Sequence, residues 1–279
     1  MFQLNSPALW RKVDIVLVAL AVLFGAAWIA AGAACDQRAL TYSDQFDPDL
    51  QSVRDVDSAV AYVKGTRRAP GALASAEAAD AFVRKRFVHG YSELAPCENW
   101  VAYLAGFIRP DLRNPVLPND ILQHRRAACS QQAIVFQAIA RELGLDVGSV
   151  RLVGHFLPAA RVDGQWRVFD PDREIDPASY SLSAFLRGDP RIEQAYGRFG
   201  QELGMVRQAE SGKIHLGDIN SNPAPRASLF QSATRFLSEF GWAVFLGLFI
   251  ARHAIRALRH DRRRRSRPRA ATRGAQIVG

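Results

Sequence analysis

Cysteine is scarce in this chain: only three of its 279 residues are cysteines, Cys35, Cys97 and Cys129. Three cysteines are too few for a disulfide scaffold. No two of them form a CxxC motif, which disfavours a thiol-redox protein. If Cys129 works as a free thiol, Cys35 and Cys97 remain, and the sequence leaves open whether these two are free or paired.

The body of the chain lacks net charge. The formal charge of the whole chain is +9, but ten arginines against one aspartate from residue 252 onward account for all of it. A basic body would favour nucleic acid as a partner, whereas a neutral body with a basic tail does not. We therefore expect no nucleic-acid partner, and a disordered basic tail at 259–279 that lies near anionic lipid headgroups.

Metal-binding motifs are missing as well. His89, His124, His155 and Cys129 could be grouped as zinc ligands, but their spacings match no tight pair such as CxxC or HExxH. We therefore expect no metal and no other cofactor.

Two apolar runs are present, one near each end. The first, Ile15 to Ala34, has twenty residues without a charge and is long enough to cross about 30 Å of hydrocarbon. Arg11 and Lys12 precede it, so the positive-inside rule places the N-terminus in the cytoplasm. Residues 1–35 are predicted to be a transmembrane anchor, with a cleaved signal peptide or a lipid-modified cysteine as alternatives.

The second run, Phe240 to Ala251, is charge-free but only twelve residues long. Extended to 233–258, it becomes a second transmembrane helix whose flanking arginines can snorkel to the interface. The arginines that follow would again be cytoplasmic. Both ends thus indicate a membrane protein with both termini inside and its central part outside. The Ala/Arg-rich residue usage fits the bacterial inner (cytoplasmic) membrane, which would place the central part in the periplasm.

The central part divides into three segments. Residues 36–74 are polar and are expected to form a stalk with a short helix at 57–64. Residues 75–215 are expected to form the folded domain, which begins with a helix capped by Ser75. Residues 216–232 contain two prolines and two asparagines and are expected to be the linker back to the membrane.

The chemistry of the chain is concentrated between Arg125 and Pro171. Cys129 opens an apolar helix that Gly144 terminates. At the start of a helix, unpaired N–H groups and the macrodipole stabilise a thiolate, the reactive form of cysteine. Any cysteine is more often a small buried apolar residue than a nucleophile. The residues that follow in the chain favour the nucleophile here.

A β-hairpin follows, with Asp163-Gly164 as its two-residue turn. If Val162 pairs with Gln165, His155 lies opposite Asp172 and Leu157 lies opposite Asp170. Paired residues share a face and faces alternate along a strand, so His155, Asp170 and Asp172 share one face. Asp170 is then within reach of the imidazole of His155, and Asp172 is the alternative carboxylate that could orient the ring.

These three residue types form a candidate triad. Cys129 would be the nucleophile, His155 the base and acid, and Asp170 the group that orients the ring. The backbone N–H of Cys129 can supply half of an oxyanion hole. The other half needs a second donor, for which the candidates are Gln123, Asn99 and Trp100.

Three features of this region resemble the transglutaminase-like superfamily of papain-like cysteine enzymes. They are Cys129 at the start of a helix, Gly154-His155 on a strand, and Trp166-x-Val168-x-Asp170-Pro171 at the close of a hairpin. The resemblance covers about residues 120–172. It implies an α+β fold in which the cysteine helix packs on an antiparallel sheet, here flanked by two transmembrane helices. It also assigns the three triad roles to Cys129, His155 and Asp170.

The resemblance implies hydrolysis or acyl transfer at an amide carbonyl of a protein or peptide, through an acyl-thioester. Ala128 stands where many members have glycine, and Phe156-Leu157 follows the histidine where an aromatic and an acidic residue are frequent. These differences leave the substrate class open. The chain has no dense acidic loop that would imply calcium. The alternative is a non-catalytic module of the same fold that binds or scaffolds partners in an envelope assembly.

Overall fold

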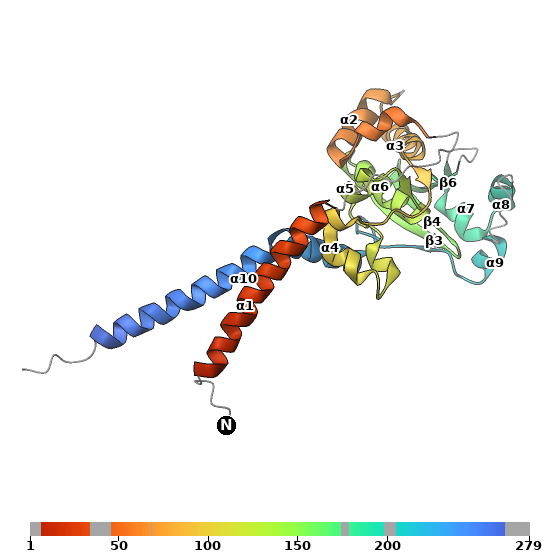
Figure 1. The fold of residues 1–279 in the computed structure, drawn as a ribbon. Coiled ribbons are helices and arrows are strands. Elements are labelled where there is room, and N and C mark those ends of the chain that lie inside the picture. The colour runs from red at the N-terminus through yellow and green to blue at the C-terminus, as the bar shows by residue number, and fades with distance from the viewer. Residues whose placement is uncertain (1–6, 34–45, 68, 174–178, 198–204, 266–279) are drawn as a thin grey trace, which may run out of the picture. The chain divides into compact units, whose positions relative to one another are not determined.

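The computed structural model describes residues 7–33, 46–67, 69–173, 179–197 and 205–265 (Figure 1). Contacts divide the chain into two compact units. The first contains the two end segments, up to residue 34 and from residue 236 onward. The second contains residues 35–235.

Among the described residues, two helices are long and apolar enough to cross a membrane. Helix α1 spans Pro7–Ala33, and its candidate membrane segment is Trp10–Gly32. Helix α10 spans Pro225–Arg265, and its candidate segment is Pro225–Arg262. Many of their large apolar side chains are exposed, as expected of surfaces that face lipid.

Within the first unit, α1 and the second part of α10 run antiparallel. Near the end of α1, the ring of Phe24 packs edge-on against Phe245, with 5.1 Å between ring centroids. Near its beginning, Asp14 forms ion pairs of 3.3 Å with Arg252 and 3.2 Å with Arg256. Later residues of α1 thus meet earlier residues of α10, and Asp14 lies beside residues 252–256 of α10.

The second unit is built on a five-stranded antiparallel sheet with the strand order β6-β5-β4-β3-β7. Its strands are β3 (Val147–Leu152), β4 (His155–Val162), β5 (Gln165–Phe169), β6 (Ser179–Ser181) and β7 (His215–Leu216). Together with the helices, it makes the unit a mixed α+β fold, as the sequence predicted. Side chains alternate between its two faces, and each face carries its own apolar core.

One face of the sheet contributes Val147, Ala160, Val162 and Phe169 to the larger core. Four helices cover this face: α2 (Val56–Thr66), α3 (Ala72–Arg86), α5 (Pro118–Gln123) and α6 (Cys129–Glu142). Helix α6 lies directly on β4 and β3, and the rings of Phe136 and Phe169 stack 5.2 Å apart. The helix that begins at Cys129 therefore packs on the antiparallel sheet.

The other face contributes Val150, Leu157, Ala159 and Val168 to a second core. Helices α7 (Leu182–Arg187) and α8 (Pro190–Gly197) supply Phe185, Ile192 and Tyr196 to it. Helix α9 (Met205–Glu210) follows along the chain. The remaining elements are η1 (Pro48–Ser52), β1 (Val88–His89), α4 (Pro96–Ala105), η2 (Pro110–Arg113) and β2 (Arg126–Ala127).

The predicted hairpin register is confirmed. Val162 pairs with Gln165 across the Asp163-Gly164 turn, and the ladder continues to Ala159 opposite Val168. Asp163 and Gly164 both have positive φ, of 49° and 79°, which is the backbone of a type I′ turn. The ladder ends before His155, so the expected pairing of His155 with Asp172 does not form as a ladder pair.

The short helix predicted at 57–64 is present as α2, but the described part of 36–74, which starts at residue 46, is not a stalk. Leu50, Ala59 and Val63 are buried in the larger core, because α2 presents an apolar face at helical spacing. Ser75 is not a cap either. Helix α3 begins at Ala72 after Gly71, and Ala72 extends its apolar face. A domain boundary at residue 75 would therefore cut a helix.

The predicted linker at 216–232 and tail at 259–279 are also wrong in part. Strand β7 pairs Leu216 with Val150, so the sheet extends past the expected domain end at 215. Helix α10 begins at Pro225, which fits because proline is favoured at the first position of a helix. It continues through 233–258 to Arg265; residues 266–279 lie outside the described residues.

The cysteines differ in redox state. Cys129 is free, and Cys97 in α4 is disulfide-bonded. Cys35 lies outside the described residues, as do the ends of the predicted anchor 1–35. The thiol that the sequence singled out is therefore available as a free group.

Candidate active site

Cys129 is the first residue of α6 and is half-buried. A short parallel ladder holds the chain just before it, because β1 pairs His89 with Ala127. The Gln131 side chain accepts hydrogen bonds from the backbone N–H of Ala128 and of Ser92, both at 3.1 Å. The start of α6 is thereby fixed to the loop that follows β1.

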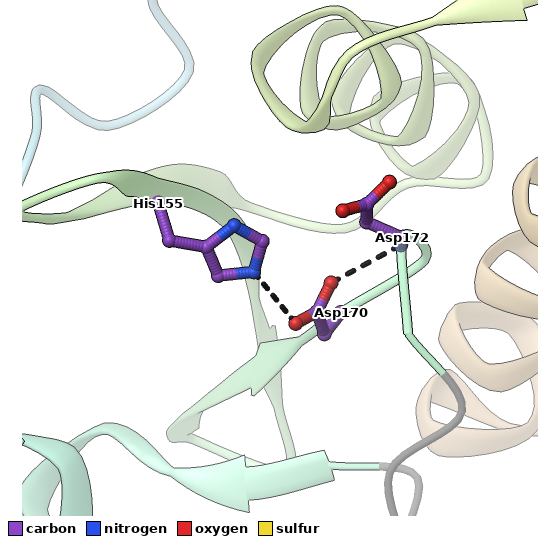
Figure 2. A group of neighbouring side chains, drawn as sticks. All are labelled: His155, Asp170 and Asp172. Carbon is purple, nitrogen blue, oxygen red and sulfur yellow. Dashed lines mark hydrogen bonds and ion pairs between the residues drawn. The ribbon is translucent and has the colours of Figure 1, made fainter. Parts of the chain in front are cut away.

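His155 and Asp170 lie at one end of the sheet, because β4 begins at His155 and β5 ends one residue before Asp170. Their side chains point toward each other (Figure 2), and 2.7 Å separates His155 Nε2 from Asp170 Oδ2. Only 4% of the His155 side chain and 1% of the Asp170 side chain is exposed. A buried ion pair of this kind keeps the ring in one orientation.

Asp170 is itself held by two further donors. The Tyr196 hydroxyl donates to Oδ2 at 2.7 Å, and the backbone N–H of Asp172 donates to Oδ1 at 3.1 Å. Burial raises the pKa of Tyr196 well above its usual value, and the charge of Asp170 adds to this effect. Tyr196 therefore stays a neutral donor, and both oxygens of Asp170 are engaged.

Cys129 lies close enough to His155 to contribute to the raised pKa of the imidazole. Burial lowers the pKa of His155, but the hydrogen bonds with Asp170 and Cys129 and the charges of both groups outweigh burial and raise the pKa to about 10. Since Asp170 occupies Nε2, Nδ1 is the ring nitrogen left for the sulfur. A protonated ring between a carboxylate and a thiol can stabilise a thiolate and later give up a proton.

Asp172, the rival acid, has other partners. Its Oδ1 lies 2.5 Å from His89 Nδ1 and accepts a hydrogen bond of 3.0 Å from the Gln132 side chain. The hydrogen bond with Asp172 raises the pKa of His89, against burial and the charges of Arg173 and His155. In this structure Asp170 therefore orients His155, and Asp172 orients His89.

His155, Asp170 and Asp172 bring three potential ligand atoms within 4.8 Å of one another, a spacing that a metal ion could use. Each of these side chains already has hydrogen-bond partners: His155 and Asp170 bind each other, and Asp172 binds His89 and Gln132. The three side chains thus belong to two histidine–aspartate pairs, His155 with Asp170 and His89 with Asp172. These contacts account for the short distances between them.

Two of the three candidate oxyanion donors are directed elsewhere. The Gln123 amide donates to the carbonyl oxygens of Arg54 at 2.8 Å and Asn119 at 3.2 Å. The buried Asn99 amide donates to Gln231 O at 3.2 Å and Thr234 Oγ1 at 2.9 Å, which ties α4 to α10. In this structure both amides are therefore engaged by other acceptors. Trp100 is half-buried on α4, and its role stays a prediction.

Sequence reasoning missed Tyr196, Gln132 and the position of His89. Tyr196 is a lone aromatic residue on α8, and no motif connects it to Asp170. Gln132 lies one helical turn after Cys129, so its proximity to the site could have been inferred from helical spacing. His89 was considered only as a zinc ligand, although Gly90 after it marks the end of a short element.

Comparison with known proteins adds no relative. A scan against protein-family models, a search of curated proteins and a search of solved structures each find no match to this chain. The residues of the site are therefore the guide to function.

Proposed function

We propose that this chain is a membrane-anchored cysteine enzyme, similar to the transglutaminase-like superfamily, that acts on an amide or peptide carbonyl. The observation that carries the proposal is the buried contact between His155 and Asp170, 2.7 Å long, with Cys129 close enough to raise the pKa of the same imidazole. The packing of α6 on an antiparallel sheet supports the papain-like architecture that the resemblance implies.

The first half of the reaction forms an acyl-enzyme. The Cys129 thiolate attacks the carbonyl carbon, and the C–S bond forms as negative charge moves to the carbonyl oxygen. The backbone N–H of Cys129 is one donor for that oxygen. His155 then transfers the proton on Nδ1 to the leaving amine, the C–N bond breaks and an acyl-thioester remains. Asp170 keeps the ring aligned throughout.

The second half releases the product. Water or an amine attacks the thioester while the now neutral Nδ1 of His155 accepts its proton. The C–S bond breaks, the thiolate leaves, and the imidazolium–thiolate pair is restored. Water gives hydrolysis and an amine gives acyl transfer.

We also propose that the unit bearing the site lies outside the cytoplasm, in the bacterial periplasm. Arg11 and Lys12 precede the apolar part of α1, and Arg252 and Arg256 lie beside them in the antiparallel pair, so both ends satisfy the positive-inside rule. The disulfide at Cys97 adds support, because disulfides persist in oxidising compartments such as the periplasm.

The activity can be tested on the detergent-solubilised full chain with a pool of short peptide amides and a fluorescent primary amine. Hydrolysis yields a free acid, acyl transfer yields a fluorescent amide, and mass spectrometry of the intact protein detects the acyl-enzyme. We expect Cys129→Ala to abolish product and adduct, with Ser130→Ala as the matched control at the next helix position. Product formation that survives Cys129→Ala would contradict the proposal and favour a non-catalytic scaffold.

A further inference from the structure

A short segment of the chain, residues 114–116, is hydrogen-bonded to both α6 and α10. Asn114 has φ −71° and ψ 117°, which is the extended backbone that a residue before proline adopts. In extended backbone the polar groups of successive residues point to opposite edges. The carbonyl of Asn114 and the N–H of Val116 therefore belong to one edge of the segment, and the carbonyl of Pro115 belongs to the other.

Helix α10 holds the first edge through the side chain of Gln231, a residue that is 1% exposed. Its amide donates to the carbonyl oxygen of Asn114 at 2.7 Å and, more weakly, to that of Leu112 at 3.5 Å. Its side-chain oxygen accepts a hydrogen bond of 2.9 Å from the backbone N–H of Val116. One side chain thus pairs both the donor and the acceptor of this edge.

Helix α6 holds the second edge through Gln131, which is also buried. The Gln131 amide donates to the carbonyl oxygen of Pro115 at 3.1 Å. Proline has no N–H, so this carbonyl is the only backbone group that Pro115 offers. The oxygen of the same side chain accepts from the N–H of Ala128, the residue directly before Cys129. Gln131 therefore connects the segment to the start of α6.

The part of α10 around Gln231 is itself fixed to the unit that carries the site. The Asn99 amide donates to Gln231 O at 3.2 Å and to Thr234 Oγ1 at 2.9 Å. Arg235 forms an ion pair of 2.6 Å with Asp120, which is 6% exposed. These contacts all lie within the unit of residues 35–235. Gln231 therefore has a fixed position from which to hold residues 114–116.

We propose that Gln231 is a positioning residue for Cys129, through which helix α10 holds the start of α6. The connection runs from Gln231 through residues 114–116 and Gln131 to the backbone of Ala128. It matters because the thiolate is stabilised only while the sulfur stays aligned with the N–H groups at the helix start and with the His155 ring. This inference rests on the proposed function. It makes the reactivity of the thiol depend on a helix that is long and apolar enough to cross a membrane.

Replacing Gln231 by methionine tests the positioning role. Methionine is similar in size but has no amide, so the Asn114 carbonyl and the Val116 N–H lose this partner. The rate of Cys129 alkylation by iodoacetamide is measured against pH on the detergent-solubilised full chain under non-reducing conditions. We expect Gln231→Met to raise the midpoint of the pH profile by about one pH unit. At pH values below the wild-type midpoint, this lowers the rate about tenfold.

Gln137→Met is the matched control. Gln137 is also 1% exposed, and its amide donates to the carbonyl oxygen of Gly148 in β3 at 3.0 Å. It lies on α6 about two turns after Cys129. Both variants lose a buried amide, so both should unfold at a lower temperature than the wild type. Only Gln231→Met should shift the pH profile.

The double variant Gln131→Met/Gln231→Met tests whether the two glutamines act through the same segment. If they do, the double variant should react within about twofold of Gln131→Met alone, because the connection is already broken. Effects of the two substitutions that multiply would show independent action and would overturn the proposed connection.

The outcomes separate the positioning role from the proposed function. A wild-type midpoint well below pH about 8.5 that Gln231→Met leaves unchanged would overturn the positioning role and leave the cysteine enzyme intact. An equal upward shift in Gln137→Met would also overturn it, because general loosening of the fold would explain both. A wild-type midpoint near pH about 8.5, that of an ordinary thiol, would instead contradict the proposed function and the positioning role with it.

Discussion

His155 Nε2 and Asp170 Oδ2 lie 2.7 Å apart at one end of two neighbouring strands, and both side chains are almost fully buried. The contact leaves Nδ1 for Cys129, which begins the helix on the other face of the sheet. The end of the sheet therefore holds a buried imidazole–carboxylate pair, on which the proposed activation of Cys129 depends.

The two neighbouring aspartates should differ sharply in their effect on the thiol. Asp170→Asn removes the charge that keeps the His155 ring protonated, and we expect it to slow alkylation of Cys129 by iodoacetamide about tenfold or more. Asp172→Asn should change the same rate less than about threefold, because Asp172 holds His89 instead. A larger effect of Asp172→Asn would show that the rival acid orients the catalytic ring.

The protonation of His155 should be visible directly. Its pKa is raised from 6.5 to about 10, so the ring should remain protonated well above neutral pH. A folded-state pKa that is raised stabilises the fold fully below pH about 6.5, and this stabilisation is lost as the pH rises toward about 10. Long-range ¹H–¹⁵N spectra of the histidine rings measure this titration. A His155 ring that titrates near 6.5 would contradict the hydrogen-bonded arrangement.

Asp80 gives a second prediction on pH. Burial raises its pKa from 3.8 to about 7, opposed by the charge of Arg84 and reinforced by that of Asp170. An acid whose pKa is raised in the folded state costs stability as the pH rises from 3.8 to about 7. Relative to Asp80→Asn, the wild type should lose about 2–3 kcal/mol between about pH 5 and about pH 8.

Thermal unfolding of both proteins, followed by near-ultraviolet circular dichroism at the two pH values, measures this difference. The unfolding temperature of the wild type relative to Asp80→Asn should therefore fall from about pH 5 to about pH 8, because the unfolded carboxyl is ionised at both pH values while the folded carboxyl resists ionisation. A constant difference in unfolding temperature at both pH values would contradict the raised pKa of Asp80.

The membrane orientation can be tested with reporter fusions. If both termini lie in the cytoplasm, green fluorescent protein fused to either end should fluoresce, and alkaline phosphatase, which needs an oxidising compartment, should be inactive there. Alkaline phosphatase inserted after Asn222, between β7 and α10, should be active. Inactive phosphatase at that insertion would contradict a periplasmic location.

Local patterns predicted the hairpin of the site well. Asp163-Gly164 determines a two-residue turn, and the turn determines the register that brings Asp170 to the face of His155. The start of α6 at Cys129 was equally local, because an apolar helical period begins there. These inferences needed no knowledge of the rest of the fold.

Contacts between segments that are far apart in the sequence could not be predicted. Asn99 is adjacent in sequence to other site candidates, but its amide bonds Thr234, and that contact depends on the path of α10. Tyr196 reaches Asp170 from α8 only because that helix covers the second face of the sheet. The segment 46–67 looked like a stalk because its polar residues outnumber the few apolar residues that pack on α3 and α6.

The central claim is that His155 activates Cys129, and the rate of Cys129 alkylation by iodoacetamide as a function of pH tests it most directly. The measurement uses the full chain with Cys97 left in its disulfide, wild type against His155→Ala, and Cys129→Ser as the blank. We predict a fast wild-type rate that persists below neutral pH and falls about tenfold or more in His155→Ala. A slow rate that rises only above pH about 8.5, equal in both proteins, is the behaviour of an ordinary thiol and would contradict the claim.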